Sequence, residues 1–97
     1  MSELLTVIAR LRAKAGQEAM LRQELKKLVA PTRAEAGCVL YDLHESNSEP
    51  GLFVFYETWK RDADLDAHFE TPHMTAFLAK VPELVEEPID LTKCTKL

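Results

Sequence analysis

The side chains best suited to chemistry in this sequence lie in one stretch, YETWKRDADLDAHFETPHMTAF, residues 56–77. His68 and His73 are five residues apart, and an imidazole can accept or donate a proton near neutral pH. Glu57 lies in an otherwise apolar run, where a carboxylate must be hydrogen-bonded, neutralised or used as a base. We therefore take His68, His73 and Glu57 as candidate catalytic residues.

Each of these residues also has a purely structural interpretation. His68 lies one helical turn after Leu65 and so faces inward, where hydrogen-bonded core histidines are common. His73 follows a proline at a helix start, where the helix dipole disfavours the charged imidazole, and a surface cap fits equally well. Glu57 can form a structural hydrogen bond with Tyr41 across a hairpin.

Aromatic side chains accompany these groups and predict an apolar pocket between helices and sheet. Trp59 shares a strand face with Glu57 and should point toward the helices, although a Trp there can equally well fill the core. An apolar pocket with a few polar groups suits a small aromatic or quinone-like molecule. The candidate substrate-binding residues are Trp59, Tyr41, Phe55, Phe69 and Phe77.

Composition argues against several other functions. The chain has 97 residues, of which 46% are hydrophobic and 29% charged, so we expect a single domain spanning residues 1–97. A net charge of -4, with Lys and Arg interrupted by acids, argues against nucleic acid as a partner. Three glycines cannot build a nucleotide-binding loop, and no His or Cys cluster has metal-ligand spacing, so we expect neither cofactor nor metal.

The first residues also indicate where the protein works. The start, MSELLTVIARLRAKAG, has no basic leader, no signal core and no stretch long enough to cross a bilayer. The pattern predicts a cytoplasmic protein with no membrane partner. Cys38 and Cys94 are then expected to be free thiols on strands rather than a disulfide.

Apolar periodicity predicts the first two elements. Residues 4–14 alternate as a strand that Gly16 ends, and residues 17–30 carry an apolar helical stripe. Pro31 is expected to kink this helix or to open a short second turn. Gly37 is the expected C-terminal cap of that turn.

The middle of the chain predicts a β-hairpin. Residues 38–46 and 52–59 read as strands, and residues 47–51 between them are turn formers. A turn centred near Glu49 sets the cross-strand register. The expected opposite pairs are Tyr41 with Glu57, Leu43 with Phe55, and Val39 with Trp59.

The remaining elements complete a β-α-β-β-α-β order. Residues 61–70 form a helix with Asp62 or Asp64 as its N-cap, a further helical stretch covers residues 72–85, and residues 87–96 close the chain as a strand. This order predicts a ferredoxin-like α+β fold, an antiparallel sheet with the helices on one face.

The strand over residues 52–59 is apolar on both faces, which a half-solvated sheet should not be. Something must therefore cover the face that the helices leave open. We expect a homodimer that stacks sheet on sheet. The apolar residues of the two faces are Phe53 and Phe55 on one, and Leu52, Val54 and Tyr56 on the other.

Three segments together resemble a known family: LLTVIARLRAKAGQEAMLRQEL, PTRAEAGCVLYDL and FVFYETWKRDADLDAHFETPHMTAF. They are similar to the antibiotic biosynthesis monooxygenase domain, and especially to its bacterial quinol monooxygenase branch. The resemblance implies a dimeric α+β barrel that oxygenates phenolic or quinol substrates with molecular oxygen and without metal, flavin or haem. The implied roles are proton acceptor for His68 or His73, ring contacts for Trp59 and Phe77, and orientation of a hydroxyl for Tyr41 with Glu57.

Departures from relatives of this fold bear on the reaction. Haem-degrading relatives carry an Asn on the first strand, where this chain offers Thr6, Ile8 or Arg10, which argues against haem breakdown. Another relative isomerises a phosphorylated hydroxy-dione, and Arg10, Arg12 or Lys14 could bind that phosphate only by facing the pocket. We therefore expect a cofactor-independent monooxygenase of a small phenolic, quinol or polyketide-like aromatic substrate. That isomerase and a non-catalytic dimeric ligand-binding module are the alternatives.

Overall fold

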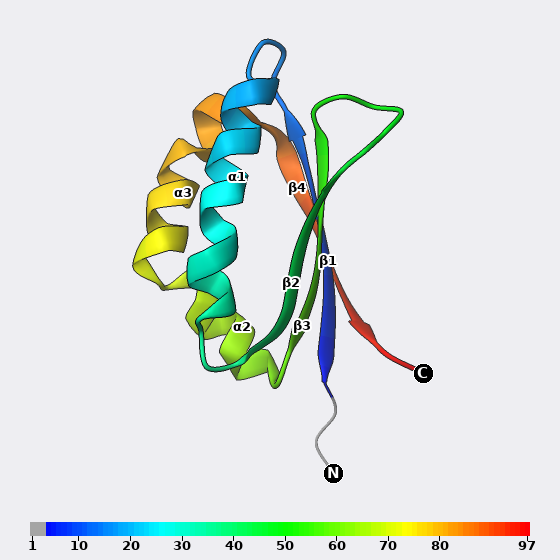
Figure 1. Cartoon of the computed structure of the whole chain (residues 1–97), viewed down its shortest axis with the longest axis vertical. Coiled ribbons are helices and arrows are strands. Elements are labelled where there is room, and N and C mark those ends of the chain that lie inside the picture. The colour runs from blue at the N-terminus through cyan, green and yellow to red at the C-terminus, as the bar shows by residue number, and fades with distance from the viewer. Residues whose placement is uncertain (1–3) are drawn as a thin grey trace.

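The computed structural model describes residues 4–97 and has two layers, a sheet and a set of helices that cover one of its faces (Figure 1). The alternating apolar residues form the strands, and the apolar stripes form the helices that pack on them. The elements in chain order are β1 (Leu5–Ala13), α1 (Glu18–Arg33), β2 (Cys38–Glu45), β3 (Leu52–Trp59), α2 (Asp62–Phe69), α3 (Pro72–Leu84) and β4 (Val85–Thr95).

The four strands form one antiparallel sheet in the order β2-β3-β1-β4. This order confirms the ferredoxin-like α+β fold, in which the first and third strands lie side by side at the centre. β4 begins at Val85, directly after α3 and before residue 87, where the sequence pattern placed its start. Cys38 and Cys94 lie on β2 and β4 as free thiols, as expected.

The end of α1 differs from the prediction. α1 continues through Pro31 to Arg33 as one helix, and Ala34 follows it in right-handed helical geometry. Gly37 does not cap the helix, because among the described residues only Gly16 and Gly51 have positive φ. Gly37 serves a different purpose: a Cβ built there would lie 2.2 Å from the Cγ of Asp64, so the missing side chain allows the loop to approach α2.

The hairpin register is mostly as expected. Two predicted pairs are confirmed, Tyr41 with Glu57 and Leu43 with Phe55. The third is wrong, because Trp59 lies opposite Cys38 rather than Val39. The register shifts between Cys38 and Leu40, where an irregularity interrupts the ladder.

The helix starts also differ in part. Arg61, in extended geometry, precedes α2 as its N-cap without a side-chain hydrogen bond, so the prediction of Asp62 or Asp64 as the cap is wrong. Both acids lie in the first helical turn, where their negative charge interacts favourably with the positive end of the helix dipole. Thr71 caps α3, and its Oγ1 accepts a hydrogen bond from the Met74 amide at 3.3 Å.

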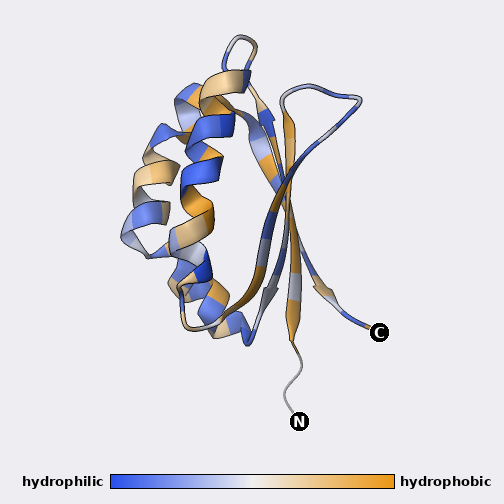
Figure 2. Ribbon diagram, in the orientation of Figure 1, coloured by the Kyte–Doolittle hydropathy of each residue, from blue (hydrophilic) through white to orange (hydrophobic). Residues whose placement is uncertain are grey.

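The core lies between the inner face of the sheet and the helices. In Figure 2 the helices mix hydrophobic and hydrophilic residues, as expected for helices with one face on a sheet. The outer face of β3 is only half covered, and Tyr56 there is 44% exposed. Among the described residues, no helix combines the length and apolar character needed to cross a membrane. The largest fully buried side chains are Trp59, Phe53, Leu21, Leu25, Leu65 and His68.

Candidate active site

A cavity of about 60 Å³ lies between the sheet and the helices. Its wall is formed by side chains from all four strands and all three helices. Among the described residues, its ionisable side chains are Tyr41, Glu57 and His68. The rest of the wall is apolar and includes Leu11, Phe55, Phe69, Met74, Phe77 and Leu91.

His68 lies on the helix side of the cavity and is 2% exposed. Its Nδ1 is 2.8 Å from Oε2 of Glu35, and because a carboxylate can only accept, Nδ1 carries the proton of this hydrogen bond. Burial lowers the pKa of His68, against the opposing effect of Glu35, so the imidazole is neutral at pH 7. The lone pair then lies on Nε2, which makes the other edge of the ring a proton acceptor.

Glu57 lies on the sheet side of the cavity and is 4% exposed. Its Oε1 accepts a hydrogen bond of 2.8 Å from the indole Nε1 of Trp59, two residues along the same face of β3. Burial raises the pKa of Glu57 to about 7, and the charge of Glu35 adds to this, while the Trp59 hydrogen bond opposes it. Near neutral pH this carboxyl group is therefore partly protonated and able to donate a hydrogen bond.

Tyr41 and Trp59 form the aromatic support of these two groups. The Tyr41 ring lines the cavity and stacks on Phe55 with ring centroids 4.7 Å apart. Burial, with the charge of Glu57, raises the pKa of Tyr41, so the phenol keeps its proton. Trp59 is fully buried with its ring centroid 4.8 Å from that of His68, and it lies behind the cavity wall rather than in it. Glu57 thus has Trp59 as its hydrogen-bond donor, rather than Tyr41, which was the alternative structural partner across the hairpin.

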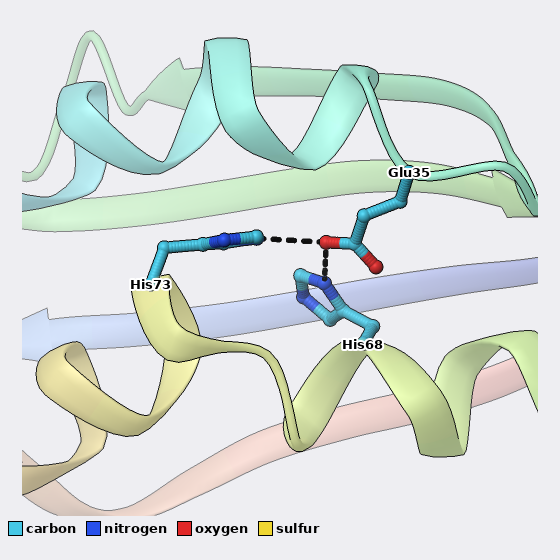
Figure 3. A group of neighbouring side chains, drawn as sticks. All are labelled: Glu35, His68 and His73. Carbon is cyan, nitrogen blue, oxygen red and sulfur yellow. Dashed lines mark hydrogen bonds and ion pairs between the residues drawn. The ribbon is translucent and has the colours of Figure 1, made fainter.

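Glu35 is the residue of this site that the sequence did not reveal. Figure 3 shows its carboxylate between two imidazoles, His68 at the end of α2 and His73 at the start of α3. His73 Nε2 is 2.8 Å from the same Oε2 atom and 3.2 Å from the hydroxyl of Thr71. His73 does not line the cavity; its ring centroid lies 6.1 Å from that of His68, and Glu35 bridges the two rings by hydrogen bonds. The sequence does show two histidines on either side of the break between α2 and α3, and this spacing is the feature that could have indicated one acceptor between them.

Comparison with known proteins identifies the family of this chain. The profile of the family described as antibiotic biosynthesis monooxygenase matches residues 4–80. The chain belongs to this family. The crystal structure of PA3566 from Pseudomonas aeruginosa superposes with a TM-score of 0.95 at 39% identity, covering 100% of this chain and 97% of that one.

Two relatives show how far the likeness within the antibiotic biosynthesis monooxygenase family extends. The protein named probable quinol monooxygenase YgiN of Escherichia coli K12 is 35% identical over 85 residues, covering 76% of this chain and 81% of YgiN. The uncharacterized protein sll1783 of Synechocystis is 38% identical over 63 residues, which are 65% of this chain but 43% of sll1783.

The basic residues Arg10 and Arg12 of β1, and Lys14 directly after it, lie away from the cavity. Arg10, Arg12 and Lys14 are all exposed, and none of them lines the cavity. The cavity wall contains no Arg or Lys from the described chain, so it lacks the phosphate partner that the hydroxy-dione isomerase reading required. Of the predicted site residues, the fold gathers six around one cavity, with Trp59 behind its wall and His73 outside it; the six are Tyr41, Phe55, Phe69, Phe77, Glu57 and His68.

Proposed function

We propose that the protein is a cofactor-independent monooxygenase that oxidises a small phenolic or quinol substrate with molecular oxygen. The observation that carries the proposal is His68, a buried neutral imidazole that Glu35 orients at 2.8 Å in the wall of an apolar cavity. The name of the relative YgiN, a probable quinol monooxygenase, supports this substrate class. Family membership alone does not fix the reaction.

In the proposed first step, His68 Nε2 removes a proton from the substrate. The product imidazolium is stabilised by Glu35, whose carboxylate already accepts the proton on Nδ1. The protonated form of Glu57 on the opposite wall donates a hydrogen bond to a substrate oxygen. The apolar wall excludes water, which strengthens both interactions.

The electrons for oxygen reduction come from the substrate itself. The deprotonated, electron-rich ring passes one electron to oxygen, and the resulting radical pair combines to form a carbon–oxygen bond. Cleavage of the oxygen–oxygen bond then leaves one oxygen atom on the product and releases the other as water. Two substrate hydrogens are consumed with one oxygen molecule, so no external reductant is required.

The size of the cavity sets a condition on this reaction. A void of about 150 Å³ accommodates benzene, whereas this cavity measures about 60 Å³. An aromatic substrate must therefore displace part of the wall. Leu78 on α3 and Leu91 on β4 are cavity residues that are also 41% and 38% exposed, so they mark the side where the wall reaches solvent.

The test of the proposed function is oxygen consumption with a panel of quinols and anthrone-like phenols. We expect one oxygen molecule consumed per product formed, in protein stripped of metals by a chelator and free of flavin absorbance. A non-catalytic ligand-binding module would instead bind these compounds tightly without oxygen uptake or product. That second result, obtained across the panel, would refute the monooxygenase.

We further propose that the protein is a homodimer through the outer face of the sheet. Support comes from β3, whose outward side chains Leu52 and Val54 are half-buried and whose Tyr56 is 44% exposed in the single chain. Covering such an apolar strip with a second copy removes it from water. Sedimentation at micromolar concentration should give twice the chain mass of 11.0 kDa, and a monomer would refute this.

A further inference from the structure

Glu35, His68 and His73 form a compact set of ligand-type atoms beside the cavity. Their Oε2, Nδ1 and Nε2 atoms all lie within 4.8 Å of one another, and both nitrogens are 2.8 Å from the same oxygen. The three residues come from three segments, the loop after α1, the end of α2 and the start of α3 (Figure 3). No spacing rule in the sequence indicates this set.

We propose that these three side chains bind one divalent transition-metal ion of the zinc type, and that the bound ion switches His68 from proton acceptor to proton donor. Two imidazole nitrogens and one carboxylate oxygen are ligands that suit Zn²⁺, with further positions left for water. The set contributes one negative charge, so a dication is partly neutralised as it binds. Hard ions such as Mg²⁺ prefer oxygen ligands and are not expected here.

The three ligand atoms must shift to accept such an ion. Zn²⁺ binds nitrogen and oxygen at about 2.0–2.2 Å, so ligand atoms around it lie about 3–3.5 Å apart. Each nitrogen must therefore move out from its present 2.8 Å contact with Oε2, and the two nitrogens, which lie within 4.8 Å of each other, must take up the same spacing. As the ion binds, the proton on each coordinating nitrogen moves, through exchange with solvent, to the other nitrogen of the same ring. Glu35 and His73 are 14% and 21% exposed, so the ion can enter from solvent without passing through the cavity.

The consequence for the cavity follows from the two nitrogens of one ring. An imidazole that coordinates a metal through Nδ1 keeps its proton on Nε2. His68 would then present an N–H, and no lone pair, to whatever occupies the cavity. The metal therefore removes the base, and this effect on turnover, unlike the binding itself, rests on the proposed function.

The binding is tested with ZnCl₂ and CoCl₂ on chelator-treated protein, by calorimetry for Zn²⁺ and by visible absorption for Co²⁺. We expect one ion per chain at micromolar concentration or below, and an affinity at least about tenfold weaker in His73→Gln and in Glu35→Gln. His44→Gln is the matched control, because His44 is exposed on β2 and outside the set. No saturable binding, or equal loss in the control, would overturn the site.

The switch is tested independently of activity by ¹⁵N NMR of the histidine rings. Zinc should move the His68 proton from Nδ1 to Nε2 and should inhibit oxygen uptake in wild type more than in His73→Gln. A site that binds zinc while the His68 tautomer stays unchanged would overturn the switch. If the metal-free protein showed no oxygen uptake, only the proposed function would be overturned, because zinc binding and the tautomer of His68 are measured without turnover.

Discussion

The two walls of the cavity each hold one buried titratable group, but they hold it in different ways. On the sheet wall, Glu57 receives its hydrogen bond from Trp59, two residues away on the same face of one strand. On the helix wall, His68 is oriented by Glu35, which is 33 residues away in the chain. The first arrangement follows from strand periodicity, whereas the second exists only when the loop after α1 packs against α2.

Burial drives both groups toward their neutral forms, from opposite directions. It raises the pKa of Glu57 to about 7 and lowers that of His68. Near pH 7 a neutral carboxyl donor and a neutral imidazole acceptor can therefore coexist on opposite sides of one apolar space. When the environments of two titratable groups shift their pKa values in opposite directions, one group can be assigned as the acid and the other as the base.

The largest expected effect is the difference in turnover between a variant of the helix wall and a variant of the sheet wall. His68→Gln removes the basic nitrogen and should lower kcat/KM at least about 100-fold, the usual range for loss of a general base. Glu57→Gln keeps an N–H donor of similar shape on the sheet wall and should lower it only about tenfold. Oxygen uptake measures both, with circular dichroism as the check on folding. If Glu57→Gln lowered kcat/KM as much as His68→Gln, or more, the helix wall would not supply the base.

The sheet wall could be predicted from the sequence because its information is local. Alternation along residues 52–59 placed Phe55, Glu57 and Trp59 on one face, and the turn placed Tyr41 opposite Glu57. The error at Val39 arose at a strand irregularity, which no alternation pattern encodes. The hydrogen-bond partner of Glu57 does not follow from the cross-strand register, because Trp59 lies two residues along the same strand.

The helix wall could be predicted only in part. The spacing from Leu65 placed His68 inward correctly, since helical periodicity decides which residues face the sheet. The role of Glu35 could not be predicted, because a single acid in a loop belongs to no periodic pattern. Gly37, read as a helix cap, is instead the point where this loop meets Asp64 of α2. Contacts between distant segments of this kind depend on packing that propensity does not describe.

A second prediction concerns the stability that Glu57 contributes as pH changes. The unfolded carboxyl loses its proton near pH 4.5, whereas the folded one keeps it to about 7, so folding is favoured below this window and stability is lost as pH rises through it. The free energy of unfolding of wild type minus that of Glu57→Gln should fall by about 3 kcal/mol at most between these values. Urea unfolding at fixed protein concentration from pH 4.5 to 8 measures this difference.

The control for this prediction is His68, whose contribution to the free energy of unfolding changes with pH in the opposite direction. Its folded pKa is lowered, so stability is lost as pH falls below the ordinary value of 6.5. The two slopes partly cancel in wild type, and His68→Gln should therefore steepen the fall that Glu57 causes. A wild-type minus Glu57→Gln difference that stays flat across the range would show that this carboxyl is not buried as described.

The smallest expected effect tests the contact on which the helix wall depends. Gly37→Ala would place a Cβ 2.3 Å from the Cβ of Asp64, which is fixed to the α2 backbone, so the loop or the helix must move. We expect a loss of about 1–3 kcal/mol in the free energy of unfolding, the usual range for overpacking. Because the same loop carries Glu35, the 2.8 Å contact to His68 should lengthen and turnover should fall as well.

Gly16→Ala is the matched control for this variant, because it introduces strain without a clash. Gly16 has φ of +87° and no neighbouring atom within 4 Å of an added Cβ, so alanine there should cost about 1–2 kcal/mol through backbone strain alone. It lies before α1, away from Glu35, and turnover per folded molecule should stay at the wild-type value. If both variants lost stability equally and neither changed turnover, the loop contact would not position the base, and the two walls would be equally independent of distant segments.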